Sequence, residues 1–190
     1  MCVDTNLQGG SSVRREMLHR GAKFDIERLT FVGNAGKELS RECIRHPGSV
    51  IILPLIRKAG EPSPQVVMIR NWRLSTERWM WELPAGTMTA GEAAAECAKR
   101  ELEEETGFIA AEWRALRSFH TAPGLTDEFM QAFVAEGLSP TRQRLEADER
   151  IEVRVVGWEE AMGMAWSDEI TDAKTLLVLM LAAREIANGK

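Results

Sequence analysis

Alternating apolar and polar residues mark several short strands along the chain. Residues 24–29 alternate in this way, and a glycine-containing turn at residues 33–36 separates them from a second short strand over residues 39–45. Residues 49–57 hold a run of valine, isoleucine and leucine, which is typical of a buried strand. Further strands are expected over residues 65–70, 79–83, 113–119, 129–135 and 151–156.

A helix is expected in the middle of the chain. Thr89 and Glu92 fit the capping box, in which a Ser or Thr is followed three residues later by Glu. An alanine-rich stretch continues to Thr106, and Gly107 suits the left-handed position at which many helices end. The pattern predicts a helix that starts near Thr89 and stops at Gly107. Two more helices are expected over residues 158–166 and 173–188.

The order of these elements predicts a mixed α/β or α+β sandwich. Strands come first, one central helix follows, and more strands precede the last helices, which differs from a regular βαβ series. The 190 residues suggest one domain, or one domain with a small appendage. We expect a flexible tail over residues 1–20, an N-terminal antiparallel β region over residues 21–48, and the main domain over residues 49–190.

Composition narrows the class of protein. The formal net charge of -5 argues against general nucleic-acid binding, which neutralises phosphates with an excess of Lys and Arg. No segment approaches the ~20 apolar residues of a membrane span, and residues 1–12 lack the apolar segment of a signal peptide. Cys2, Cys43 and Cys97 form neither a disulfide framework nor a CxxC metal site. We therefore expect a cytoplasmic protein with reduced thiols.

Candidate chemistry lies on the central helix. Glu101, Glu104 and Glu105 are spaced i, i+3, i+4, so that their carboxylates share one helical face. Like charges at this spacing cost an exposed helix roughly 0.2–0.5 kcal/mol. A hard divalent cation such as Mg²⁺ removes that penalty, since it takes oxygen ligands and bridges phosphate oxygens. A solvated acidic face without a metal is the alternative interpretation.

The residues around these glutamates extend the motif. Gly86 is followed after five residues by Glu92, and after seven more by Arg100-Glu101-Leu102; Glu104-Glu105 and Gly107 complete the series. This segment resembles the Nudix box at every fixed charged and glycine position. Phe108 is a mild departure, because the family usually has a smaller aliphatic residue there.

The resemblance implies both a fold and a metal site. The fold would be a Nudix α/β/α sandwich with a mixed sheet, and the box would form its loop–helix–loop. The implied cofactor is Mg²⁺, or Mn²⁺ in its place. The implied ligands are Glu101, Glu104, Glu105, as the central ligand, and the backbone carbonyl of Ala85. Gly86, Glu92, Arg100 and Gly107 would be the structural residues of the motif.

Outside the box the chain resembles the ADP-ribose pyrophosphatase branch of the family. The segments that carry this likeness are residues 45–50, 70–73, 81–86 and 172–175, and Pro123, sixteen residues after Gly107. The resemblance implies hydrolysis of ADP-ribose to AMP and ribose 5-phosphate. Hydrolysis of another nucleotide sugar, such as GDP-mannose or UDP-glucose, is an alternative. A non-catalytic nucleotide-sensing domain is another, although the intact glutamates argue against it.

Several residues outside the helix are candidates for substrate binding. An acidic protein needs a local basic patch for a diphosphate, which Arg41, Arg70 and Arg73 could supply, although each has surface charge as its alternative. Pro123 is implied near the substrate by the branch resemblance. Phe24 or Trp72 are candidates for stacking on an adenine.

The branch places its general base on a loop before a late strand, which here begins at Ile151. Glu149, two residues earlier, is the first candidate, and Glu146 is the second. Glu104 or a metal-bound hydroxide is the alternative if neither serves.

The N-terminal β region suggests an assembly. A lone two-stranded hairpin is marginal in water and needs a partner surface. The resembling branch uses such a region to build a homodimer, in which early residues of one subunit line the partner's pocket. We therefore expect a homodimer with Phe24, Ile26 and Arg41 near the substrate. A hairpin that folds back on its own core is the alternative.

Overall fold

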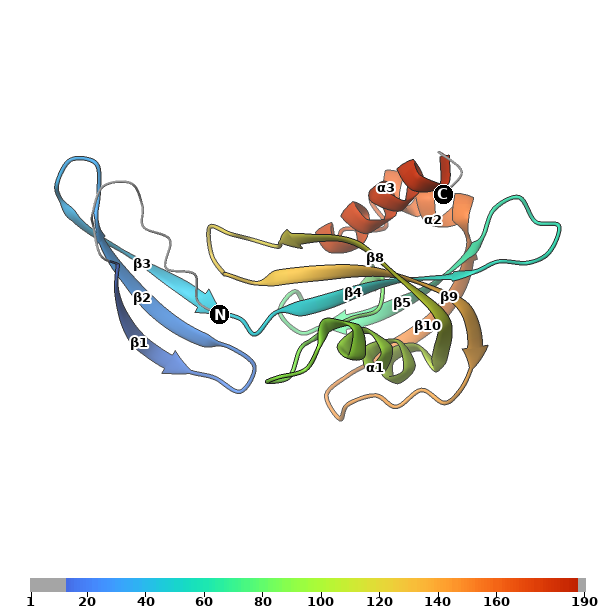
Figure 1. The fold of residues 1–190 in the computed structure, drawn as a ribbon, viewed down its shortest axis with the longest axis horizontal. Coiled ribbons are helices and arrows are strands. Elements are labelled where there is room, and N and C mark those ends of the chain that lie inside the picture. The colour runs from blue at the N-terminus through green and yellow to red at the C-terminus, as the bar shows by residue number, and fades with distance from the viewer. Residues whose placement is uncertain (1–12, 188–190) are drawn as a thin grey trace. The chain divides into compact units, whose positions relative to one another are not determined.

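A computed structural model of the protein describes residues 13–187 and separates them into two compact units (Figure 1). One unit contains the residues up to Pro47 together with His120–Phe129. The other contains Gly48–Phe119 and the residues from Met130 onwards. The second unit holds the whole of the Gly86–Phe108 segment, so it carries the chemistry expected from the sequence.

The first unit contains a three-stranded antiparallel sheet in the order β1-β2-β3. Its strands are β1 (Arg14–Arg20), β2 (Asp25–Val32) and β3 (Glu38–Arg45). The prediction of a flexible tail is wrong for residues 14–20, and residues 1–12 lie outside the described part. The polar residues of β1 pair across the sheet, since Arg28 Nη1 donates to Glu16 Oε2 at 3.0 Å. Charge complementarity between strands therefore replaces the apolar pattern that marks other strands.

The second unit is built on a seven-stranded sheet in the order β10-β5-β4-β9-β8, with β6 paired to β5 and β7 paired to β4. β4 and β9 run parallel, whereas β5 is antiparallel to β4, β6 and β10, so the sheet is mixed, as expected. Every strand expected from the sequence is present, while β1 and β7 were not expected. The strands are β4 (Ser49–Ile56), β5 (Gln65–Arg73), β6 (Arg78–Glu82), β7 (Ala85–Thr87), β8 (Phe108–His120), β9 (Phe129–Pro140) and β10 (Ile151–Gly157).

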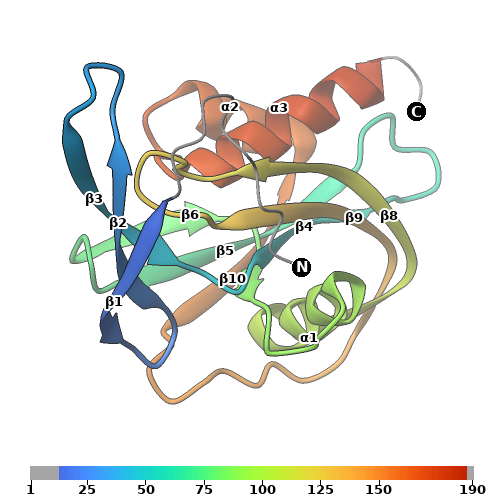
Figure 2. The ribbon, with the colours of Figure 1, turned by 60° about the vertical axis from the view of Figure 1, so that its left-hand side comes forward.

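Helices cover both faces of this sheet. The helices are α1 (Ala94–Thr106), α2 (Trp158–Trp166) and α3 (Ala173–Ala187). β4 is buried on both faces: Val50 and Ile52 join the core cluster that contains Leu102 of α1, while Ile51 and Leu53 join the cluster of α2 and α3. Figures 1 and 2 both show α1 on one side of the sheet and α2 with α3 on the other. The expected α/β/α sandwich is confirmed.

The start of α1 differs from the prediction. The helix begins at Ala94, not near Thr89, and Ala93 occupies its N-cap position. Glu92 Oε2 does accept the Thr89 N–H at 2.9 Å, but this contact closes a turn before the helix. Gly91 has a φ of 80°, which lies outside helical geometry and separates the turn from α1. Gly107 ends the helix as predicted, with a φ of 70° and its N–H donating to the Glu103 carbonyl at 2.9 Å.

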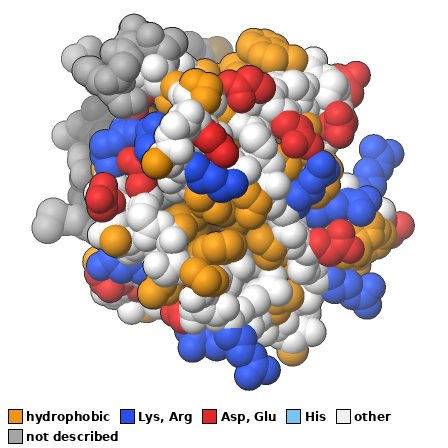
Figure 3. All heavy atoms as spheres, turned by 90° about the vertical axis from the view of Figure 1, so that its right-hand side faces the viewer, with side chains coloured by type: hydrophobic (Ala, Val, Ile, Leu, Met, Phe, Trp, Pro, Cys, Tyr) orange, Lys and Arg blue, Asp and Glu red, His pale blue; other side chains and the backbone are white. Residues whose placement is uncertain are grey.

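The surface mixes charge and apolar side chains. On the face in Figure 3, hydrophobic side chains gather near the middle, with Lys, Arg, Asp and Glu side chains interspersed around them. Within residues 13–187, none of the helices combines the length and hydropathy needed to cross a bilayer.

Candidate active site on the glutamate-rich helix

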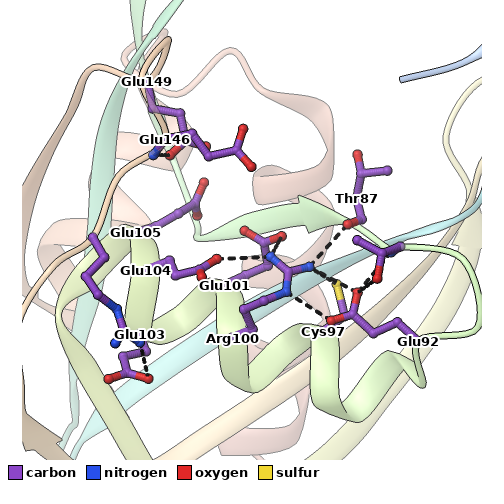
Figure 4. Close-up of polar contacts among 12 residues, drawn as sticks. Thr87, Glu92, Cys97, Arg100, Glu101, Glu103, Glu104, Glu105, Glu146 and Glu149 are labelled. Atoms are coloured by element: carbon purple, nitrogen blue, oxygen red, sulfur yellow. Dashed lines mark hydrogen bonds and ion pairs between the residues drawn. The ribbon is translucent and has the colours of Figure 1, made fainter. Parts of the chain in front are cut away.

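Arg100 organises the carboxylates of α1. Its Nη1 donates to Glu101 Oε1 at 2.7 Å and to Glu104 Oε2 at 3.0 Å (Figure 4). Its Nε and Nη2 donate to the two carboxylate oxygens of Glu92, at 2.9 and 3.0 Å. These bonds from Arg100, together with the Thr89 amide, lower the pKa of Glu92 to about 2. Arg100 and Glu92 thus form an ion-pair network with the glutamates of α1, and their structural roles in the motif stay predictions.

Glu101 and Glu105 are buried carboxylates. They are 8% and 3% exposed, respectively. Burial raises the pKa of Glu101, with partial relief from Arg100, and raises the pKa of Glu105 well above its usual range. The negative charge of Glu149 also raises the pKa of each of these carboxyl groups. A divalent cation would stabilise the ionised forms of these two buried carboxylates.

The segment before the box lies directly against these carboxylates. Glu105 Oε2 accepts the Ala85 N–H at 2.9 Å. A Cβ atom at Gly86 would lie 1.9 Å from Cδ of Glu101, so a larger residue there would displace the Glu101 carboxylate. The local sequence favours this contact. Pro84, which has no N–H, separates β6 from β7, and β7 then pairs with β4. The predicted ligand Ala85 and the predicted structural residue Gly86 are both brought to the acidic face of α1.

A loop from β9 to β10 carries both candidate bases. Glu149 Oε2 accepts the backbone N–H of Glu146 at 2.8 Å, and Figure 4 shows both residues on the loop next to α1. Farther upstream the loop is hydrogen-bonded to the end of the helix. The Arg144 N–H donates to the Glu104 carbonyl at 2.9 Å, and Gln143 Nε2 donates to the Glu105 carbonyl at 2.7 Å. The structure thus brings Glu149 into the electrostatic field of Glu101 and Glu105.

An ion cluster around the buried Glu82 flanks the site, and of its members only Arg73 was among the predicted site residues. Arg73 donates from Nε and Nη2 to the two oxygens of Glu82, at 2.7 and 2.6 Å, and Glu82 is only 1% exposed. Lys174 Nζ donates to Glu82 Oε2 and to Asp172 Oδ1, both at 2.8 Å. Although burial opposes it, the bonds from Arg73 and the charge of Lys174 lower the pKa of Glu82. Arg73, predicted to bind substrate, is therefore engaged in a structural pair.

No structural role was predicted for residues 172–175, which only carry part of the resemblance to the ADP-ribose pyrophosphatase branch. The spacing of Asp172, Lys174 and Thr175 was a usable signal, because an Asp shortly before a helix commonly caps it. Thr175 N–H does donate to Asp172 Oδ2, at 3.0 Å. Glu82 could not have been paired with Lys174 from sequence, since 92 positions separate them.

The remaining substrate-binding candidates lie on β5 or in the first unit. Arg70 lies over Trp79, with its Cζ 5.4 Å from the ring centroid, and strand alternation puts it on the sheet face of buried Met68, which packs with α2 and α3. Trp72 packs edge-on against Trp79 at 5.8 Å. Phe24, Ile26, Arg41 and Pro123 belong to the first unit. Their roles at the substrate stay predictions.

The donor set fits a hard divalent cation. Carboxylate oxygens are the ligands that Mg²⁺ and Mn²⁺ prefer, and Glu101, Glu104 and Glu105 supply them from one helical face. In the arrangement of residues 13–187, no three His, Cys, Asp or Glu side chains converge as a metal cluster. Arg100 instead bonds both Glu101 and Glu104, so a cation would share these carboxylates with a guanidinium.

The amino-acid sequence of this chain is similar to those of known proteins. A family model described as NUDIX domain matches residues 45–177. The ADP-ribose pyrophosphatase of Bacillus subtilis (strain 168) is 34% identical over 166 residues, covering 86% of this chain and 87% of that protein. The methanol dehydrogenase activator of Bacillus methanolicus is 34% identical over 146 residues, covering 76% of each.

A solved structure shows the same fold. The crystal structure of an ADP compounds hydrolase superposes with a TM-score of 0.79 at 20% identity, covering 94% of this chain and 95% of that one. The family match covers the sheet, the helix α1 and the loop that carries the candidate bases. This chain therefore belongs to the NUDIX family and is a Nudix hydrolase.

Proposed function

We propose that the chain hydrolyses the pyrophosphate bond of ADP-ribose, giving AMP and ribose 5-phosphate, and that it uses Mg²⁺. The observation that carries the proposal is the burial of Glu101 and Glu105 against the Ala85–Gly86 backbone. Such a pair is costly for a protein that only senses a nucleotide, whereas a metal-dependent hydrolase requires it. The B. subtilis relative and one from Mycobacterium tuberculosis, 34% identical over 152 residues, both bear the name ADP-ribose pyrophosphatase.

Each residue of the site has a separate proposed role. Glu101, Glu104 and Glu105, with the carbonyl of Ala85, would hold the metal. When bound, the metal supplies charge neutralisation at the pyrophosphate and lowers the pKa of water. The Ala85 N–H orients Glu105, and Arg100 orients Glu101 and Glu104. Glu149 would take the proton from the attacking water, as a general base.

We also propose a compartment, a class of substrate and an oligomeric state. The enzyme would act in the cytoplasm on a small nucleotide sugar, as a homodimer. The free thiols of Cys43 and Cys97 suit that compartment. Phe24, Arg41 and Pro123 would contact the nucleotide from one subunit or its partner, and Arg70 would supply positive charge.

A panel of substrates tests the function. ADP-ribose, GDP-mannose and UDP-glucose are each incubated with Mg²⁺, and phosphate is measured after coupling to a phosphatase. We expect ADP-ribose to have the highest kcat/KM, and Glu105→Gln to abolish its turnover. Preference for another sugar would move the substrate assignment. Glu105→Gln activity within about tenfold of the original chain at saturating Mg²⁺ would refute the metal site.

A further inference from the structure

We infer that Thr175, at the start of α3, is a positioning residue for the metal-binding segment Leu83–Gly86. The inference rests on the proposed metal-dependent hydrolysis and extends it to a residue on the opposite side of the sheet from α1. It concerns the placement of backbone atoms, because Thr175 bonds the backbone of Leu83.

The contact is a buried hydrogen bond between a backbone and a side chain. Leu83 N–H donates to Thr175 Oγ1 at 2.9 Å, and both residues are 0% exposed. Pro84 interrupts the sheet ladder directly after Leu83, so no neighbouring strand residue is paired with Leu83 in the β5–β6 register. A buried N–H must find an acceptor, and here the acceptor comes from a helix 92 positions away.

Three consecutive residues are held by three different elements. The Leu83 N–H is bonded by α3, the Pro84 carbonyl accepts the Ile52 N–H of β4 at 2.9 Å, and the Ala85 N–H donates to Glu105 of α1 at 2.9 Å. The next residue, Gly86, lies so close to Glu101 that a Cβ there would meet its carboxylate, so the segment directly contacts a proposed metal ligand. A shift at Leu83 is therefore transmitted to Ala85 and Glu105.

Ion pairs reinforce the same connection one residue earlier. Glu82 precedes Leu83 and is bonded by Lys174, the residue before Thr175. Asp172 completes the link by accepting from both Lys174 Nζ and the Thr175 N–H. The first turn of α3 thus fixes the side chain of Glu82 and the backbone of Leu83 together.

The experiment compares Thr175→Val, which keeps the shape but loses the acceptor, with Thr175→Ser, which keeps the hydroxyl. Val178→Ala is the matched control, because it removes buried apolar atoms from the same helix without removing a hydrogen bond. Thr175→Ala replaces the valine variant if that chain does not fold. Two quantities are measured: kcat and KM for ADP-ribose at saturating Mg²⁺, and the Kd for Mn²⁺ from the electron paramagnetic resonance signal of the free ion.

We expect Thr175→Val to lower kcat by on the order of tenfold or more and to weaken Mn²⁺ binding by a similar factor, with KM changed less than about threefold. Thr175→Ser should restore both quantities. The inference is overturned if the valine variant stays within about twofold of the original chain, or if Val178→Ala causes equal losses. If the original chain hydrolyses no nucleotide sugar, the proposed function fails, and the Mn²⁺ titration alone decides the inference.

Discussion

Gly86 lies against the carboxyl group of Glu101 with no space for a methyl group between them. A Cβ at residue 86 would be 1.9 Å from Cδ and 2.0 Å from Oε1 of Glu101. The glycine of the box is therefore required here for close approach between a strand backbone and a helix side chain. Any larger residue must displace the carboxylate that we propose as a metal ligand.

Gly86→Ala should weaken metal binding while leaving the fold in place. We expect the Mg²⁺ concentration for half-maximal activity to rise by about tenfold or more, because Glu101 must rotate away. Gly163→Ala is the control: it lies on α2, and a Cβ there would meet nothing within 4 Å. Equal Mg²⁺ dependence in the two variants would contradict the ligand role of Glu101.

Glu149→Gln should lower kcat by ~10²–10⁴ with little change in KM, the size expected for losing a general base. Glu146→Gln is a matched control, since Glu146 contacts Glu149 through its backbone N–H, which the substitution keeps. Steady-state kinetics on ADP-ribose measure both. Loss in Glu146→Gln with none in Glu149→Gln would transfer the role to Glu146.

The stability of the metal-free chain should fall as the pH rises. The folded pKa of Glu105 is raised above its ordinary 4.5, so its contribution is fully present below that pH and is lost as the pH rises through the folded value. Glu105→Gln cannot ionise and should show a weaker pH dependence. Urea unfolding in EDTA, from pH 4.5 to neutral pH, measures this. Parallel curves for the two chains would rule it out.

Glu82→Gln should destabilise the chain by roughly 3 kcal/mol, because it leaves Arg73 and Lys174 beside a buried site without their counter-charge. Glu152→Gln is the comparison: its ion pair with Arg70, at 3.6 Å, is exposed on both sides. That variant should stay within about 0.5 kcal/mol of the original chain. Urea unfolding of both variants decides the matter, and a loss of similar size in the two would show that burial does not matter.

Deleting residues 1–46 should disrupt the assembly and raise KM. This removes the sheet β1-β2-β3, which we propose as the dimer contact and as one wall of the nucleotide pocket. Light scattering should give double the 21.3 kDa chain mass for the full protein and a single chain mass for the truncated one. A chain lacking only residues 1–12 controls for shortening. Truncation that changes neither mass nor KM would support a hairpin that folds back on its own core.

Local patterns predicted much of the structure. Every strand and helix that the apolar pattern indicated is present, and the spacing of Glu101, Glu104 and Glu105 correctly indicated one helical face. Gly107 was recognised as the end of α1 because left-handed geometry at a helix end is a local preference of glycine. These features depend on neighbours in sequence, which a single chain displays.

Features that depend on how the segments fold and pack were missed. β1 was predicted as part of a tail because its sequence is rich in charged residues. Some of these charges are paired with Arg28 and Glu38 on other strands, which the sequence alone does not show. The start of α1 was misplaced because the Thr89–Glu92 contact forms equally well in a turn, and Gly91 then delays the helix. The sequence also does not show that Arg73 is bonded to the buried Glu82, nine positions away, and the role of Arg73 at the substrate stays a prediction.

Hydrogen bonds join α1 to the first part of the loop between β9 and β10. Thr141, Gln143 and Arg144 are bonded to the carbonyls of Gly107, Glu105 and Glu104, so this part of the loop is anchored to the C-terminal end of α1. For protein engineering, residues 141–144 form one unit with the C-terminal end of α1 and should be exchanged only together with it.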